Sequence, residues 1–154
     1  MKKIGFILLL TLLFQACKVK QDTNVISGYY NYDTDCVNQN RDGTILVKAW
    51  GQGVDQGQAE LNARRNAIDD VLFKGFRTNC SITPIISNPN VKRDNKNFFD
   101  NFYSKNGDFL RFVSRPNTKR VERSELKEGK KAFEIQVIVK RNELLNYINN
   151  NIKI

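Results

Sequence analysis

The segment TILVKAWGQGVDQGQ, residues 44–58, places a strand pattern immediately before the start of a helix. Side chains alternate along residues 44–50, which is the period of a half-buried β-strand. One face of this predicted strand carries Ile45, Val47 and Ala49, and the other carries Leu46, Lys48 and Trp50. We therefore expect a firm strand here.

A helix is predicted from about residue 56 to residue 73. The glycines within residues 51–53 are expected to break the strand, and Asp55 with Gln58 three residues later resembles a capping box. Small side chains then recur every four residues and form one narrow ridge, made of Ala59, Ala63, Ala67 and Val71. Such a ridge lets a helix lie close to a sheet.

Two further features of this predicted helix concern its exposed side and its end. Glu60 and Arg64 have the spacing of a favourable ion pair on one helix face. Gly75 lies just beyond the last apolar position and is a natural helix stop.

The glycines of residues 51–57 also imitate a dinucleotide-binding fingerprint, in which a pyrophosphate approaches a helix N-terminus. No second parallel strand is predicted after the helix, and the third glycine is displaced by one position. We interpret the glycines as a tight connection between strand and helix, and we expect no cofactor.

The remainder of the chain predicts an α+β domain. Residues 25–32 fit a first strand or an ordered arm, and residues 38–43 fit a turn-rich break. Beyond the helix, the predicted elements are an irregular stretch over 77–97, a short helix over 94–105, strands over 109–115 and 132–140, and a last helix from about Asn142. The expected core is strand, helix, strand, strand: a small antiparallel sheet packed by the alanine-ridged helix, with extra short helices.

A charged segment, residues 118–131, joins the last two predicted strands. Its composition fits the extended arms and turn of an antiparallel hairpin around Glu128 and Gly129. Mixed charges of this kind are typical of a solvated surface.

The N-terminal segment has the features of a lipoprotein export signal. Lys2 and Lys3 precede an apolar run that ends at Gln15, well short of the roughly twenty residues that span a bilayer. Phe14 spoils the small-x-small site of an ordinary secretory signal, the alternative interpretation, whereas Cys17 directly follows a small residue. We therefore expect residues 1–16 to be a signal peptide and Cys17 to be the lipidation site.

The mature chain would then comprise a lipidated tether, residues 17–24, and a single α+β domain, residues 25–154. Each buried CH₂ of an acyl chain such as palmitate contributes about 0.8 kcal/mol, so two or three chains hold a protein in a membrane. Lys18 follows the cysteine where an aspartate would favour the inner membrane, and no acidic cluster of the cell-surface type is present. We expect an outer-membrane lipoprotein, with the periplasmic face favoured over the cell surface.

The other two cysteines, Cys36 and Cys80, form one pair in an oxidising compartment, where a disulfide is the default. A reactive thiol or a metal ligand is the alternative. The chain contains no histidine, which excludes Ser-His and Cys-His nucleophile pairs and every imidazole metal site. Asp33 and Asp35 supply too few carboxylates for a calcium site, so we expect no metal. Because histidine is missing, we also expect no catalytic residue.

The chain is basic, with a formal net charge of +9. Residues 1–16 hold two lysines and no acidic residue, so the mature chain would carry about +7. In a cytosolic protein this excess of positive charge would suggest nucleic-acid binding. An exported protein does not meet nucleic acid, so we exclude that class of partner. Phospholipid head groups, lipopolysaccharide and acidic proteins remain as partners, unless the charge serves only solubility.

Two groups of residues form the candidate partner surface. The first is the aromatic cluster Phe98, Phe99, Phe102 and Tyr103, which is expected to fill one end of the core because four neighbouring aromatics are costly to leave in water; a docking patch for a partner is the alternative. The second is the basic group of the hairpin, chiefly Lys119, Arg120, Arg123 and Lys131, which is expected to be a solvated surface; contact with anionic lipid or an acidic protein is the alternative.

Several short segments carry a family resemblance: KAWGQG at 48–53, DVLFKG at 70–75, NPN at 88–90 and FF at 98–99. Across most of residues 36–140 the chain resembles small uncharacterised lipoproteins of Bacteroidota-type bacteria. More remotely, its strand, glycine turn and alanine-ridged helix are similar to helicobacter-type small lipoproteins and to the amino-terminal domain of the flagellar T protein. These resemblances imply a compact α+β domain used in envelope assemblies, without enzyme activity.

The expected function is that of a lipid-anchored envelope protein, a non-catalytic interaction or assembly module. Its partners would be the membrane, through the lipid, and an envelope protein; no nucleic acid or small-molecule substrate is expected. The alternative is a binding module for envelope polyanions or cell-wall glycan that uses the basic surface.

Overall fold

The computed structural model describes residues 34–115, 121–123 and 131–153, which belong to one compact unit bounded by Asn31 and Ile154. The predicted signal peptide, Cys17, the tether and the strand or arm over 25–32 lie outside the described residues. Within the described part, no helix is long and apolar enough to cross a membrane.

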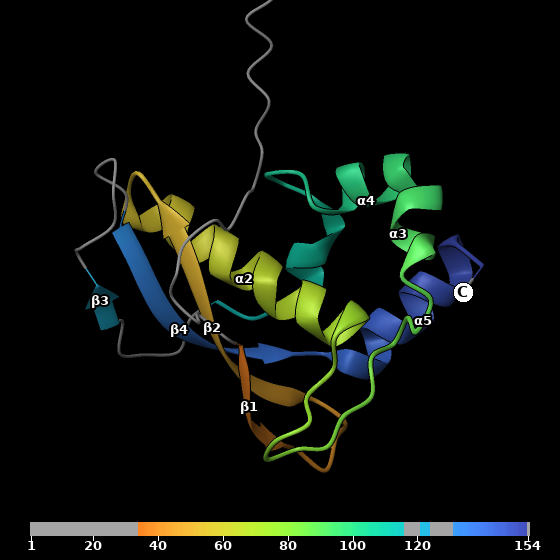
Figure 1. The fold of residues 1–154 in the computed structure, drawn as a ribbon, viewed down its shortest axis with the longest axis horizontal. Helices are drawn as coiled ribbons and strands as arrows, with labels where there is room; N and C mark the ends of the chain where they lie inside the picture. Colours follow the sequence, from red (N-terminus) through yellow and green to blue (C-terminus); the bar gives the residue numbers. More distant parts are fainter. Residues whose placement is uncertain (1–33, 116–120, 124–130, 154) are drawn as a thin grey trace, which may run out of the picture. The chain divides into compact units, whose positions relative to one another are not determined.

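The described strands form one antiparallel sheet of four strands in the order β1-β2-β4-β3. Their bounds are β1 Asp35–Gln39, β2 Ile45–Gly53, β3 Val121–Arg123 and β4 Lys131–Val139. Figure 1 shows α2, Gln56–Phe73, lying along this sheet. The α+β fold predicted from the sequence is therefore confirmed.

Strand β2 continues through the glycines that were expected to break it. Gly51 pairs with Phe133 of β4, and Gly53 pairs with Lys131. The glycines serve helix packing instead: a Cβ at Gly51 would lie 2.0 Å from the Ala59 carbonyl oxygen and 2.2 Å from the Ala63 nitrogen. The expectation of a strand break was wrong because missing side chains let a helix backbone approach the strand without interrupting its ladder.

Helix α2 has the bounds, the cap and the buried ridge that the sequence predicts. The Gln58 amide nitrogen donates to Asp55 Oδ1 at 2.8 Å, and the Val54 nitrogen donates to Gln58 Oε1 at 3.0 Å. The ridge of Ala59, Ala63, Ala67 and Val71 is fully buried. Asn62 and Asn66 reinforce the contact, because their amides donate to the β2 carbonyls of Gln52 and Trp50.

The short helices differ from the prediction in two places. The predicted helix over 94–105 is α4, Lys96–Phe102. A further short helix, α3 Asn90–Asp94, lies in the stretch that was expected to be irregular and ends at Asn95. The predicted strand over 109–115 is wrong: Asp108–Arg111 forms the 3₁₀ helix η2, and only Val113 bridges to Val139 of β4. Phe109 and Phe112, three residues apart, both enter the core, as one helical turn allows and strand alternation does not.

The hairpin prediction is partly confirmed, because β3 pairs antiparallel with β4 and Arg123 lies opposite Ala132. The turn around Glu128 and Gly129 lies outside the described residues. β1, Asp35–Gln39, is a strand where the sequence suggested a turn from Asn38 onward; its ladder is shifted between Cys36 and Asn38. The final helix, α5, runs over Arg141–Asn151, and it begins one residue before the predicted start at Asn142.

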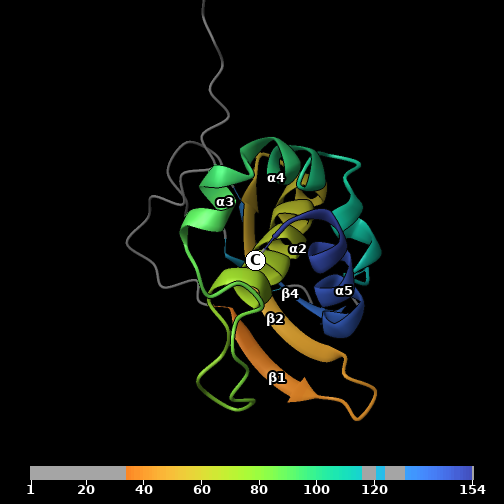
Figure 2. The ribbon, with the colours of Figure 1, turned by 90° about the vertical axis from the view of Figure 1, so that its right-hand side faces the viewer.

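The core lies on the α2 side of the sheet. Figures 1 and 2 show the helices gathered on that side, with α2 nearest the strands. Alternate residues of β2 and β4 enter this core, and the other helices close it with Phe99, Phe102, Phe109, Leu144 and Ile148, each at most 3 % exposed. These other helices hold most of the aromatic cluster.

Candidate functional site

The aromatic cluster of Phe98, Phe99, Phe102 and Tyr103 is mainly part of the core. Phe99 is 3 % exposed and Phe102 is 2 % exposed, whereas Phe98 and Tyr103 are partly buried and pack against the core. Phe99 and Phe102 therefore do not form a partner surface in the folded domain, because α4 turns them inward. Of the expected docking residues on α4, only Phe98 and Tyr103 retain accessible surface.

The four rings pack against aromatic residues of three other elements. Ring centroids lie 5.4 Å apart for Phe73 and Phe99, and 5.9 Å apart for Phe102 and Tyr147. The first pair is tilted and the second is stacked, and aromatic pairs at such distances add to the free energy gained by burial. The aromatic cluster thus joins α4 to α2 and α5.

Asp69 on α2 holds Tyr103 and Lys92 together. The Tyr103 hydroxyl donates to Asp69 Oδ1 at 3.1 Å, and Lys92 Nζ of α3 forms an ion pair with the same oxygen. Lys92 Nζ also lies 5.0 Å from the Phe73 ring centroid, within cation–π range. Burial and the neighbouring Asp69 carboxylate raise the pKa of Tyr103 well above its usual value, so the hydroxyl remains a donor.

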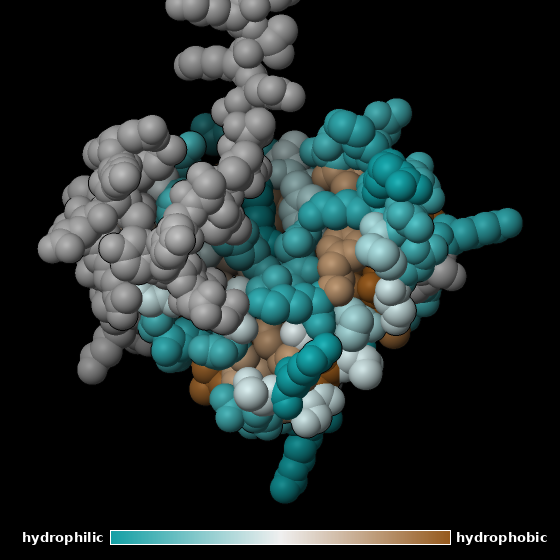
Figure 3. All heavy atoms as spheres, in the orientation of Figure 1, coloured by the Kyte–Doolittle hydropathy of each residue, from teal (hydrophilic) through white to brown (hydrophobic). Residues whose placement is uncertain are grey.

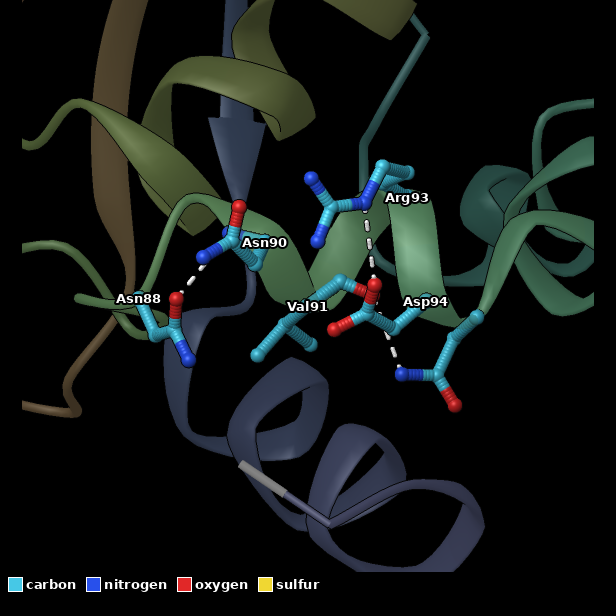
Figure 4. A network of polar contacts seen from close by, with 6 residues as sticks. Asn88, Asn90, Val91, Arg93 and Asp94 are labelled. Atoms are coloured by element: carbon cyan, nitrogen blue, oxygen red, sulfur yellow. Dashed lines mark hydrogen bonds and ion pairs between the residues drawn. The ribbon is translucent and has the colours of Figure 1, made fainter.

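Helix α3 begins and ends with local polar contacts, as Figure 4 shows. The Asn90 nitrogen donates to Asn88 Oδ1 at 3.0 Å, and Arg93 Nε donates to Asp94 Oδ1 at 3.0 Å. Asn95 Nδ2 donates to the Val91 carbonyl at the end of the helix. These contacts shape the turn of the NPN segment and leave Arg93 an exposed, locally paired cation.

A second tyrosine, Tyr147 of α5, is fixed by η2. Its hydroxyl donates to Asp108 Oδ2 at 2.7 Å, and the Arg111 guanidinium lies 5.7 Å from its ring centroid. Burial, the hydrogen bond to Asp108 and the charge of that carboxylate raise the pKa of Tyr147 to about 12. Tyr147 therefore remains neutral at physiological pH and connects α5 to η2.

Cys36 and Cys80 form a disulfide, with Cα atoms 5.9 Å apart, inside the usual range for such bonds. The bond links β1 to the loop after α2. Asn79 and Ser81, which flank Cys80, both have positive φ angles, and Asn79 Nδ2 donates to the Cys36 carbonyl at 3.2 Å. The predicted pairing of the two cysteines is confirmed.

The basic group of the hairpin is only partly placed. Lys119 and Arg120 lie outside the described residues, and Arg123 and Lys131 are placed only as backbone positions of β3 and β4. Among the described residues, no group of three or more cysteine, aspartate or glutamate side chains could hold a metal ion. Figure 3 shows a mostly hydrophilic surface in which the apolar areas visible in that view are small and separate.

Sequence reasoning missed a pair of arginines, Arg64 of α2 and Arg115 after η2. Arg64 does not form the expected ion pair with Glu60; its Nη2 donates to the Val113 carbonyl at 2.9 Å. Burial and the like charge of Arg115 lower the pKa of Arg64, while Glu60 opposes the shift. The hydrogen bond from Arg64 to Val113 joins residues 49 positions apart, and no local sequence signal could have shown it.

No protein family model matches the chain, and no curated protein or solved structure matches it either.

Proposed function

We propose that the protein is a lipoprotein of the bacterial outer membrane, attached through Cys17 to the periplasmic face and working as a non-catalytic interaction or assembly module. The N-terminal segment carries this proposal, because its charge, apolar length and cysteine position fit a lipoprotein signal better than a spanning helix. Membership in the Bacteroidota-type lipoprotein group is part of the same proposal.

The Cys36–Cys80 disulfide supports export. Disulfides persist in the periplasm and outside cells, and they are rare in a reducing cytosol. The same bond uses the two remaining cysteines, so that Cys17 is left for acylation.

The absence of histidine from the sequence supports contact rather than catalysis as the main activity. It removes the residue that most often serves as a general acid or base near neutral pH. Tyr103 and Tyr147 have raised pKa values, but both are engaged in contacts that join helices. The raised pKa values of both tyrosines therefore have a structural explanation.

Metabolic labelling with an alkyne analogue of palmitate tests the anchor. The wild-type chain should take up the label and pellet with membranes, and Cys17→Ser should do neither. Cys80→Ser is the matched control, because it changes a cysteine outside the signal and should retain the label. An unlabelled wild-type chain, or equal labelling of Cys17→Ser, would contradict the anchor.

The interaction role is tested separately by crosslinking in intact cells and purification from detergent-solubilised membranes. A module of this kind should bring down the same envelope protein from independent preparations. Cys17→Ser should lose that partner if membrane attachment is needed for the encounter. Recovery of the chain alone under every crosslinking condition would count against an assembly role.

Binding of envelope polyanions or cell-wall glycan is a second candidate function, favoured by the basic charge of the chain, with a pI near 9.6. Such binding should weaken steeply with added salt and with charge reversal at Lys119, Arg120 and Lys131. Salt-insensitive binding would exclude this electrostatic mode.

A further inference from the structure

The turn between α4 and η2 contains Asn106-Gly107, the only Asn-Gly pair in the sequence. Gly107 is required there by lack of space, because a Cβ at this position would lie 2.1 Å from the Phe102 carbonyl oxygen and 2.7 Å from the Asn101 carbonyl oxygen. Both are backbone atoms, which cannot rotate away as a flexible side chain can. The packing of α4 therefore keeps an asparagine directly before a residue that has no side chain.

The exposed side chain of Asn106 lies next to the backbone nitrogen with which it can react. Among the described residues this side chain makes no hydrogen bond. The Gly107 nitrogen donates to the Ser104 carbonyl at 3.0 Å, and that bond has to open before the nitrogen can attack. Ser104 and Lys105 are exposed as well, and short surface turns of this kind open locally at little cost in free energy.

We propose that Asn106 is a modification site at which the chain deamidates without an enzyme. Hydroxide removes the Gly107 amide proton, the nitrogen forms a bond to Cγ of Asn106, and the Cγ–Nδ2 bond breaks with release of ammonia. Water then opens the resulting cyclic imide at either carbonyl and leaves aspartate or isoaspartate. Glycine favours the ring closure because no side chain shields its nitrogen and its backbone is permissive. Water is the co-reactant, and no electrons are transferred.

Asp42-Gly43, in the turn between β1 and β2, is a comparison within the same chain, because aspartate can close the same ring. Asp42 Oδ1 accepts from the Thr44 nitrogen at 2.9 Å and from Thr44 Oγ1 at 2.8 Å. These hydrogen bonds hold the carboxylate and lower the pKa of Asp42, so the group remains ionised and is a poor electrophile. We therefore expect ring closure at Asn106 and not at Asp42.

The position of the site gives the reaction a structural consequence. Asp108, two residues later, accepts from the Tyr147 hydroxyl at 2.7 Å, and the Leu110 nitrogen donates to the Gly107 carbonyl at 3.2 Å. Isoaspartate lengthens the backbone before Gly107 by one methylene, and both products place a new carboxylate near Asp108, where like charges repel. Deamidation should therefore loosen η2. This inference depends neither on the lipid anchor nor on a protein partner.

The test incubates the full chain in dodecyl maltoside micelles at mildly alkaline pH, beside a synthetic peptide of residues 104–110 with blocked ends. Trypsin cuts after Lys105 and Arg111, so mass spectrometry of the fragment 106–111 shows the mass gain of OH in place of NH₂. The folded chain should convert no more than about tenfold more slowly than the peptide, at a rate that rises in proportion to hydroxide. Methylation by an isoaspartyl methyltransferase identifies the isoaspartate product.

Asn106→Gln is the matched variant, because glutamine keeps the amide but has to close a larger and less favourable ring. It should abolish the mass gain in this fragment. In the converted wild-type protein, the Leu110 amide should exchange with solvent at least about tenfold faster, whereas amides of β2 should keep their rates.

Four results would overturn the inference. They are conversion more than about tenfold slower than in the peptide, an equal mass gain in Asn106→Gln, isoaspartate formed as fast at Asp42 as at Asn106, and an unchanged exchange rate at Leu110.

Discussion

Gly51 sets how closely α2 can lie on the sheet. A methyl group there would meet backbone atoms of α2, with the Ala59 oxygen at 2.0 Å and the Ala63 nitrogen at 2.2 Å, and backbone cannot rotate away as a flexible side chain can. We expect Gly51→Ala to lower the free energy of unfolding by about 3 kcal/mol, the upper part of the range for overpacking. Urea denaturation measures the change.

Gly57, in the first turn of the same helix, is the matched control. A Cβ there would approach only Asp55 Oδ1, at 3.4 Å. Gly57→Ala should be neutral or should stabilise the protein by up to about 1 kcal/mol, because alanine favours the helix. Equal losses in both variants would show that Gly51 is not a packing constraint.

Tyr147 gives stability a pH dependence in the alkaline range. Its pKa is about 12 in the folded protein, above the usual value of 10.0, so an unfolded chain loses the proton first as the pH rises. Its contribution is fully present below pH 10 and is lost as the pH rises toward 12. The difference in unfolding free energy between wild type and Tyr147→Phe should therefore shrink over that window, as pH-dependent urea denaturation would show. A constant difference would contradict the contribution of Tyr147.

Helices α3 and α4 are fastened to α2 through the Asp69 carboxylate, which accepts from both Tyr103 and Lys92. Asp69→Ala leaves the half-buried Tyr103 hydroxyl without its partner and should cost about 2 kcal/mol in unfolding free energy. Asp100→Ala removes an exposed carboxylate that pairs with Lys96 within one helix, and it should cost less than about 0.5 kcal/mol.

The role of Asp69 in joining the helices can be separated from general destabilisation by hydrogen exchange. Amides of α3 and α4 should lose more protection in Asp69→Ala than amides of β2 and β4, because only the helical layer loses its attachment. A double-mutant cycle with Tyr103→Phe should show coupling. Additive effects would indicate that Asp69 stabilises the protein in another way.

Local signals explain which elements the sequence predicts well. Helix α2 has a cap at Asp55, a four-residue alanine period and a stop at Gly75, and all three act within the helix itself. The segment over 109–115 has apolar residues that fit either period, and tertiary packing of Phe109 and Phe112 selected the helical turn. β1 was missed in part because only Cys36 among its residues is buried.

Some features of the candidate sites could likewise be predicted from the sequence, and others depend on tertiary structure. The pairing of Cys36 with Cys80 could be predicted because the alternatives were few once Cys17 was assigned to the lipid. Burial of Phe99 and Phe102 could be predicted, because four neighbouring aromatic residues are costly to leave in water. The Arg64–Val113 contact depends on the path of the whole chain.

At the scale of the whole molecule, the disulfide connects the edge strand to the loop after the central helix, across a sequence separation of 44 residues. In the chain-entropy model, a closed loop of that length stabilises the folded state by about 4 kcal/mol, which is a large part of the net stability of a small domain. Cys36→Ala combined with Cys80→Ala should lower the urea midpoint accordingly. Alanine at both positions leaves neither a thiol nor a hydroxyl in the buried environment of Cys36.

Reduction of the wild-type protein provides the internal comparison for that variant. Dithiothreitol should move the wild-type urea midpoint close to that of the double variant, and it should leave the double variant unchanged. This comparison separates the covalent link from the packing of two small side chains, because reduction keeps both cysteines. If the reducing agent shifted both proteins, or neither, the disulfide would not be the constraint that holds β1 and the loop together.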